Sequence, residues 1–198
     1  MKALIVVDIQ NDFLPGGPLA VPEGHAVIAV ANDMMSQYEL VVGTQDWHPP
    51  GHRSFADNWQ KPVGEIVTLA GLPQVLWPIH CVAGSAGAQF APGLDHHRFE
   101  AVFRKGMDPE IDSYSAFFDN GHRKRTGLAG YLKGRQVDEV HVLGLATDYC
   151  VKYTALDASG QGFRVCVLQS GCRGVNLAAD DSNKAIREMA SAGVTILP

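Results

Sequence analysis

Short apolar runs rich in valine, isoleucine and leucine recur along this chain of 198 residues. They are continuous rather than alternating, which is typical of parallel strands covered on both faces. We expect strands over 3–7, 39–43, 99–103, 139–145, 163–168 and 193–197. Helical stretches lie between several of these runs, over 24–37, 124–133, 148–160 and 178–191. The alternation predicts an α/β fold with a doubly wound, mostly parallel sheet of about six strands and helices on both faces.

No repeat or low-complexity linker divides the chain, so we expect a single domain over residues 1–198. Two loop-rich stretches, 44–62 and 71–95, contain proline, glycine, histidine and tryptophan. Long loops in a compact domain are usually functional or disordered, and the aromatic and histidine content argues against disorder. We therefore expect both stretches to contribute to a functional site.

Composition excludes several classes of partner. The net charge is −5, and no basic cluster is longer than Arg123–Arg125, so nothing favours binding to nucleic acid or to an anionic membrane. The N-terminal apolar run is interrupted by Asp8, too soon for a signal peptide, and no run approaches the roughly 20 residues that span a bilayer. We expect a cytoplasmic protein. Its four cysteines form no C-x-x-C pair, which favours reduced thiols.

Cys150 lies where the strand pattern over 139–145 ends and a helix is expected to begin. Thr147 or Asp148 can cap that helix, which places the sulfur in the first helical turn. There the helix dipole favours negative charge, so we expect the pKa of the thiol to be lowered and the thiolate to be the nucleophile. The alternative is a small buried apolar residue.

Reactive side chains collect at one edge of the predicted sheet. Ligands bind outside the carboxyl ends of the strands in open α/β sheets, and Asp8, Lys105 and Cys150 all belong to that edge, as does 44–48. A nucleophilic thiol needs a base, a cation and N–H donors for an oxyanion. Taken alone, Asp8 also fits a cap of its own loop, and Lys105 a solvated residue at the rim.

Three side chains fit a metal site. Asp46 and His48 are two residues apart, so both can point the same way in an extended segment, and His80 adds a third candidate. One Asp with two His leaves coordination positions open, as in catalytic sites. His52 is a candidate fourth ligand or a partner of the ligands. Surface histidines are common, so the pattern alone leaves the site open.

Five motifs make the chain resemble the nicotinamidases, within the isochorismatase-like cysteine hydrolases. They occur in the order and at the spacing of that family and extend over nearly the whole chain. The motifs are Asp8 with Gln10-Asn11-Asp12-Phe13, Thr44-Gln45-Asp46-Trp47-His48-Pro49, Trp77-Pro78-Ile79-His80-Cys81-Val82, Lys105-Gly106 and Gly144-Leu145-Ala146-Thr147-Asp148-Tyr149-Cys150-Val151.

The resemblance implies a Cys–Asp–Lys triad that hydrolyses nicotinamide to nicotinate and ammonia through a thioester. Cys150 would be the nucleophile, Asp8 the general base and later the acid, and Lys105 the electrostatic support. A cis peptide would join Leu145 and Ala146, and the N–H groups of Ala146 and Cys150 would form the oxyanion hole.

The resemblance also implies one divalent metal ion on Asp46, His48 and His80, usually zinc, with iron or manganese as alternatives. In relatives the metal faces the pyridine nitrogen of the substrate, and pyrazinamide is a further candidate substrate. The implied substrate pocket consists of Phe13, Trp77, Leu145, Ala146 and Tyr149. Without the motifs, the three aromatic residues among these read equally well as core.

Other functions stay open at this stage. Carbamoylsarcosine- and ureidoacrylate-type amidases share the triad but generally lack the metal set, and an isochorismatase proper does not need the cysteine. Outside catalysis, a zinc-binding or thiol-redox module could use His80, Cys81 and Cys150. Oligomeric state is open as well, a homo-oligomer included, because no exposed apolar stripe fixes it.

Overall fold

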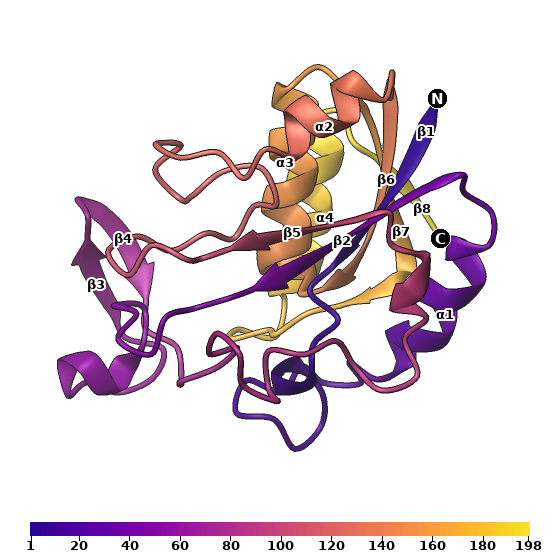
Figure 1. Ribbon diagram of the computed structural model, residues 1–198. Helices are drawn as coiled ribbons and strands as arrows, with labels where there is room; N and C mark the ends of the chain where they lie inside the picture. Colours follow the sequence, from indigo (N-terminus) through magenta and orange to yellow (C-terminus); the bar gives the residue numbers. More distant parts are fainter.

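A computed structural model describes residues 1–198 as a six-stranded sheet with helices around it and a separate two-stranded hairpin (Figure 1). The order in the large sheet is β5-β2-β1-β6-β7-β8, and every neighbouring pair is parallel. The strands are β1 (Lys2–Val7), β2 (Leu40–Asp46), β3 (Ile66–Leu69), β4 (Leu72–Val75), β5 (Ala101–Lys105), β6 (Glu139–Leu145), β7 (Arg164–Arg173) and β8 (Thr195–Leu197). The predicted six-stranded parallel sheet is confirmed.

Helices cover both faces of this sheet, as predicted. Helices α3 and α4 pack against each other on one face, and α1 contacts β6 and β7 from the other (Figure 1). The α-helices are α1 (Ala26–Met35), α2 (Leu128–Gly134), α3 (Lys152–Gly160) and α4 (Asp181–Ser191). Short 3-10 turns occur at η1 (Asn11–Phe13), η2 (Ala56–Trp59) and η3 (His96–Arg98), and a π-helical turn, η4, at Thr147–Val151.

Two strands extend beyond their apolar runs. β2 continues through polar residues to Asp46, and β7 continues to Arg173. The end of β2 pairs with β5 up to Asp46 and Lys105, so the strand persists where its side chains are already polar. Every residue of β2 is buried. This extension carries the polar side chains of the second strand into the interior of the molecule.

The hairpin of β3 and β4 is absent from the sequence prediction. Residues 72–75 were expected to be irregular, and that expectation is wrong. Ala70 and Gly71 connect the two strands, and both have positive φ, 53° and 80°, as a tight turn of type I′ requires. Pro73 makes β4 hard to recognise in the sequence, because a proline within a run of residues argues against a central strand.

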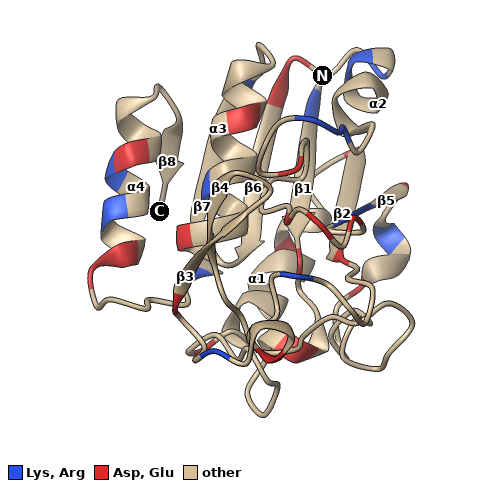
Figure 2. Ribbon diagram, turned by 90° about the vertical axis from the view of Figure 1, so that its left-hand side faces the viewer, with Lys and Arg blue, Asp and Glu red and all other residues tan.

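The charges of the molecule are interspersed. Helix α4 carries both signs along its length, and no broad region of one sign is visible in this view (Figure 2). This agrees with the absence of a long basic cluster from the sequence. None of the helices combines the length and the apolar character that crossing a membrane requires.

Candidate active site

The carboxyl ends of three strands bring Asp8, Lys105 and Cys150 together. Asp8 follows β1, Lys105 is the last residue of β5, and Cys150 lies in η4 directly after β6. The Lys105 Nζ atom lies 2.8 Å from Asp8 Oδ2 and 3.3 Å from Cys150 Sγ. All three side chains are buried. A carboxylate, an ammonium and a thiol therefore share one small region without bulk water.

Asp8 is held in an unusual conformation. Its φ is 48°, in the left-handed region that non-glycine residues seldom adopt. The Thr44 hydroxyl donates to Asp8 Oδ1 at 2.6 Å, and Oδ2 has no aligned hydrogen-bond donor despite its proximity to Lys105. Burial raises the pKa of the Asp8 carboxyl, and the Lys105 charge opposes that shift only in part. Oδ2 is thus available to accept a proton, and the carboxylate is a stronger base than an ordinary aspartate.

Lys105 is fully enclosed by acceptors. Besides Asp8 and Cys150, its ammonium group contacts Asp46 Oδ1 at 2.5 Å and the Ser113 carbonyl oxygen at 3.0 Å. Burial alone would lower the pKa of this amine, but the neighbouring carboxylates Asp46 and Asp8 more than reverse that effect and raise it well above its ordinary value. Lys105 is therefore a permanent buried cation. The expectation of a solvated lysine at the rim is wrong.

The turn that carries Cys150 differs from the expected capped helix. Residues 147–151 form a π-helical turn, and no side chain caps it. The Asp148 carboxylate instead accepts hydrogen bonds from the backbone N–H groups of Val175 and Asn176, at 2.9 and 2.7 Å. It fixes the segment that follows β7 rather than the start of the helix. π-Helical turns are frequent at functional sites.

The pKa of Cys150 also differs in direction from the prediction. Burial raises the pKa of the thiol well above its ordinary value, and the Lys105 charge lowers it by less. The position of Cys150 in a first helical turn predicts only the effect of the helix dipole, which favours the thiolate. Removal of the sulfur from water disfavours the thiolate and is the larger effect. The resting thiol is neutral, so the nucleophile has to be formed by proton transfer.

Asp46, His48 and His80 form a convergent set of candidate metal ligands. One ligand atom of each lies within 4.8 Å of the other two. Asp46 Oδ2 lies 3.8 Å from His48 Nε2 and 3.9 Å from His80 Nε2. Each ring uses Nδ1 against a backbone carbonyl, that of Gly106 at 2.9 Å and that of Pro78 at 2.8 Å. This leaves both Nε2 lone pairs facing the carboxylate, which is the arrangement that metal-binding histidines adopt.

The protonation of the two rings suits a cation. Burial lowers the pKa of His48 and of His80 to about 4, so both are neutral near pH 7. Neutral imidazoles beside a carboxylate accept a metal ion without first losing protons. The three residues therefore fit a divalent metal ion.

His52 lies beside this set. Its ring centroid is 4.4 Å from that of His48, and its Nδ1 pairs with Ser54 Oγ at 2.7 Å. Its Nε2 is buried and has no hydrogen-bond partner. His48, His52 and Asp112 form another group whose ligand atoms lie within 4.8 Å of one another. His52 therefore remains a candidate both for a fourth metal ligand and for a residue that supports the ligands.

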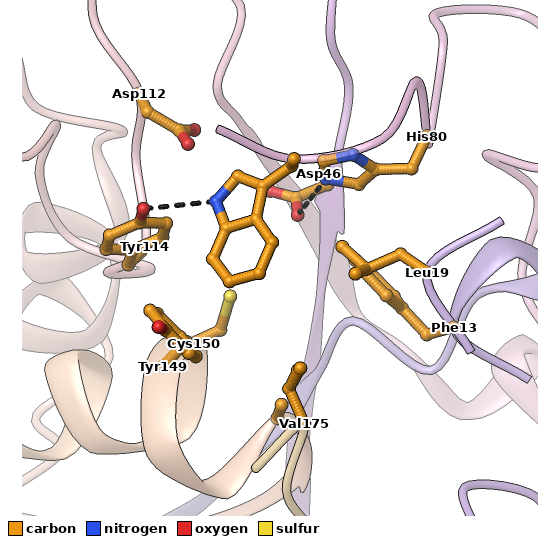
Figure 3. A pocket seen from close by; sticks show the side chains of 11 residues that line it. Phe13, Leu19, Asp46, His80, Asp112, Tyr114, Tyr149, Cys150 and Val175 are labelled. Carbon is orange, nitrogen blue, oxygen red and sulfur yellow. Dashed lines mark hydrogen bonds and ion pairs between the residues drawn. The ribbon is translucent and has the colours of Figure 1, made fainter. Parts of the chain in front are cut away.

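A pocket lies between Cys150 and two of the three candidate metal ligands, Asp46 and His80. Cys150 points into it between Tyr114 and Phe13, with Asp46 and His80 on a further wall (Figure 3). Eight of its eleven lining residues are hydrophobic. A mostly apolar lining with a few polar groups is typical of a site that binds a small molecule. The lining residues are Phe13, Leu19, Asp46, Trp77, His80, Asp112, Tyr114, Ala146, Tyr149, Cys150 and Val175.

Most of the expected pocket residues line this pocket. Phe13, Trp77, Ala146 and Tyr149 do so, whereas Leu145 is fully buried in the core and is not part of the lining. The sequence prediction missed four lining residues, which come from segments without a recognisable motif. They are Leu19, Asp112, Tyr114 and Val175.

A polar network fixes one wall of the pocket. The Tyr114 hydroxyl accepts hydrogen bonds from Trp77 Nε1 at 3.1 Å and from Gln74 Nε2 at 3.0 Å. The Gln74 amide also donates to Asp112 Oδ2 at 3.1 Å. Trp77 and Tyr149 meet edge to face, with ring centroids 4.8 Å apart. These contacts hold the aromatic rings around Cys150 in one arrangement.

The backbone before the nucleophile is cis between Leu145 and Ala146. The Ala146 N–H makes no hydrogen bond within the protein, although Ala146 is buried. A free N–H donor next to the thiol is one part of an oxyanion hole.

The isochorismatase domain pattern matches residues 2–198 of the chain. The chain belongs to the isochorismatase family. It is 50% identical over 199 residues to the nicotinamidase of Escherichia coli, covering 98% of this chain and 93% of that protein.

Solved structures show the same similarity. The yeast nicotinamidase bound to the inhibitor nicotinaldehyde is 33% identical, with a TM-score of 0.94 and coverage of 100% of this chain and 99% of that one. The pyrazinamidase of Pyrococcus horikoshii in complex with zinc is 36% identical, with a TM-score of 0.82 and coverage of 99% and 98%. The family predicted from the motifs is thereby confirmed.

Proposed function

We propose that this protein is a cysteine amidohydrolase that converts nicotinamide to nicotinate and ammonia. The observation that carries the proposal is a single small pocket with Cys150 on one wall and Asp46 and His80 on another. The nicotinamidases among its relatives support the choice of substrate. Pyrazinamide, a related ring amide, is a second substrate in this proposal.

The reaction begins with a proton transfer. Asp8 Oδ2 takes the proton of the Cys150 thiol, and the Lys105 ammonium stabilises the thiolate at 3.3 Å. The sulfur then attacks the carboxamide carbon, a C–S bond forms, and the carbonyl oxygen becomes an oxyanion. The N–H groups of Ala146 and Cys150 donate to that oxygen.

The intermediate then releases ammonia. Asp8 gives its proton to the departing nitrogen, the C–N bond breaks, and a thioester remains on Cys150. Asp8 next accepts a proton from water, and the hydroxide attacks the thioester. The C–S bond breaks, Asp8 returns its proton to the sulfur, and the product leaves as nicotinate after its carboxyl proton is lost to solvent. Asp8 thus acts twice as base and twice as acid within one turnover.

Asp46, His48 and His80 would hold one divalent metal ion, with zinc the first candidate. When bound, the metal supplies a Lewis acid that accepts the lone pair of a ring nitrogen. The zinc complex of the Pyrococcus horikoshii pyrazinamidase supports this choice. Phe13, Trp77 and Tyr149 line the pocket and would enclose the flat ring.

Ammonia release from a panel of amides tests the proposal. We expect turnover with nicotinamide and pyrazinamide, and much less with benzamide, which has the same shape but no ring nitrogen. Preference for a linear amide would instead favour a carbamoylsarcosine- or ureidoacrylate-type amidase. Exhaustive chelation, verified by metal analysis, should abolish turnover, and retention of full activity would remove the metal from the proposal.

The nucleophile is tested separately. Cys150→Ala should release no ammonia, and Cys172→Ala, which removes another buried thiol, should retain activity. Nicotinaldehyde should inhibit by adding the Cys150 S–H across its carbonyl group, and that inhibition should be lost in Cys150→Ala. Unchanged turnover in Cys150→Ala would reject the assignment.

A further inference from the structure

A second group of metal-binding side chains lies at the opposite end of the sheet. Glu139 and His141 are two residues apart on β6, so their side chains share one face. Cys166 on β7 is the direct register partner of His141. One ligand atom of each residue lies within 4.8 Å of the other two. Two hydrogen-bonded strands thus present a carboxylate, an imidazole and a thiol at one place.

The ring of His141 is held between Tyr38 and Glu139. Its Nδ1 pairs with the Tyr38 hydroxyl at 2.5 Å, and its Nε2 pairs with Glu139 Oε1 at 2.8 Å. Metal-binding histidines characteristically donate the N–H of the second ring nitrogen to an oxygen, which fixes the ring and its tautomer. Tyr38 occupies that position. In the metal-free protein Nε2–H donates to Glu139 Oε1, and Nδ1 accepts from the Tyr38 hydroxyl. When an ion takes Nε2, the ring proton moves to Nδ1, which then donates to the Tyr38 oxygen.

We propose that Glu139, His141 and Cys166 bind a second divalent cation that favours mixed sulfur, nitrogen and oxygen ligands, of which zinc is the first candidate. Binding would replace the Nε2–H···Oε1 hydrogen bond by two bonds to the ion, and the Cys166 thiol would lose its proton to solvent. Ligand bonds of about 2.0–2.3 Å require the three side chains to close in slightly. Cys166 is only partly buried, which gives it room to rotate.

The basic side chains around Glu139 do not prevent an ion from binding to it. Glu139 Oε1 lies 3.1 Å from Lys2 Nζ, and Oε2 lies 2.9 Å from Arg164 Nη1. Arg164 also pairs with Asp138 at 2.8 Å, so its charge is shared between two carboxylates. Lys2 is an exposed side chain and can move aside when an ion takes Oε1. Oε2 can keep Arg164 while Oε1 binds the ion.

The group is accessible and separate from the active site. Tyr38 and His141 line a surface groove together with Lys2 and Glu39, which gives an ion a path inward. His141 lies near the start of β6 and Leu145 at its end, about 13 Å further along the strand. The catalytic pocket begins beyond that point. The proposal therefore adds a site and does not reinterpret the first one.

Cobalt(II) is a suitable probe, because a bond between cobalt and a thiolate gives an intense charge-transfer band in the near ultraviolet. The proposed catalytic ligand set contains no sulfur, but the Cys150 thiol lies close to Asp46. Titrations should therefore use the Cys150→Ala background. We expect one sulfur-bound cobalt per chain, with the band complete by two equivalents because Asp46, His48 and His80 can bind a second ion without sulfur. The band should vanish on adding Cys166→Ser and persist on adding Cys172→Ser. Cys172 is a matched control because it is a buried thiol on the same strand.

Further variants separate ligation from loss of fold. Tyr38→Phe, which keeps all three ligands, should weaken cobalt binding at this site about tenfold. Cys166→Ser alone should keep its circular dichroism spectrum and its nicotinamide hydrolysis. Absence of the band from the Cys150→Ala protein, or a band unaffected by Cys166→Ser, would overturn the proposal. The result is independent of the proposed function, because the readout is a sulfur ligand and not turnover.

Discussion

Replacement of Lys105 by methionine tests the physical basis of the active site most directly. The change keeps the length of the side chain and removes only its charge. Lys105 Nζ lies 2.8 Å from Asp8 Oδ2 and 2.5 Å from Asp46 Oδ1, and both carboxylates are buried. At an effective dielectric constant of about 20, each pair attracts by about 6 kcal/mol. Desolvation of the three ions, at several kcal/mol each, offsets most of that attraction.

The expected loss is therefore much smaller than the gross attraction. Removing one partner of a buried ion pair destabilises a protein by about 3–5 kcal/mol, because an unpaired buried charge remains. We expect that loss for Lys105→Met in urea unfolding of the chelated protein, where no bound metal compensates. A parent stability of about 10 kcal/mol, the middle of the usual range of about 5–15 kcal/mol, leaves such a variant folded at 25 °C. Ammonia release should fall by at least about 100-fold, because without the ammonium group the buried Asp8 carboxyl holds a proton more tightly and is lost as a base.

Two further variants make this prediction decisive. Lys61→Met removes a lysine from an exposed pair with Glu65 and should cost at most about 1 kcal/mol. Asp8→Asn in the Lys105→Met background should restore part of the lost stability, because it removes one of the unpaired buried carboxylates. A Lys105→Met protein as stable as the parent, with no gain from Asp8→Asn, would refute the reasoning.

Three other predictions concern the metal ligands, the pocket wall and the base. Gly106→Ala should lower the amount of metal bound per chain, measured by mass spectrometry, because the added Cβ atom would clash with the His48 ring. Gly84→Ala is the control, since a Cβ atom at Gly84 meets no neighbouring atom, and this variant should bind metal normally. Tyr114→Phe removes the acceptor of a buried indole N–H and should cost about 1–3 kcal/mol in urea unfolding. The acid limb of the kcat/KM profile should lie above the ordinary aspartate value of about 4, because burial raises the pKa of Asp8, which is inactive as a base once protonated.

Each of these predictions has an outcome that contradicts it. Unchanged metal content in Gly106→Ala would show that the His48 ring can move without losing its ligand role. A Tyr114→Phe protein of unchanged stability would mean that water replaces the lost hydroxyl. An acid limb at or below pH 4 would mean that Asp8 is not the group that limits the reaction.

The fold was predictable because buried parallel strands have a distinct sequence pattern. Continuous apolar runs locate all six strands, and the runs stop only where side chains become polar. β2 is the informative exception. Its last residues, 44–46, are polar but stay paired with β5, so hydrophobicity alone ends the strand too early. The β3–β4 hairpin was missed for a related reason, since it is short, contains a proline and lies outside the main sheet.

The candidate site was predictable where motifs mark it and not where packing builds it. Tyr114 and Trp77 are 37 residues apart and meet only in the folded chain. Leu145 belongs to a motif yet points into the core, because a motif does not define which side of a strand faces the pocket. The predicted direction of the Cys150 pKa shift was wrong, because the sequence indicates where a helix begins but not how deeply the thiol is buried. The expected single domain over residues 1–198 stays a prediction.

Burial of Asp8, Lys105 and Cys150 together fits the proposed role of a neutral Cys150 thiol as the nucleophile. Proton transfer from Cys150 to Asp8 moves one negative charge from Oδ2 to Sγ and leaves the net charge unchanged. Lys105 Nζ lies 2.8 Å from the first atom and 3.3 Å from the second. At an effective dielectric constant of about 20 the two attractions differ by only about 1 kcal/mol. Lys105 therefore attracts both forms nearly equally, so its charge does not oppose the transfer, and burial raises the pKa of Asp8 and that of Cys150 in the same direction.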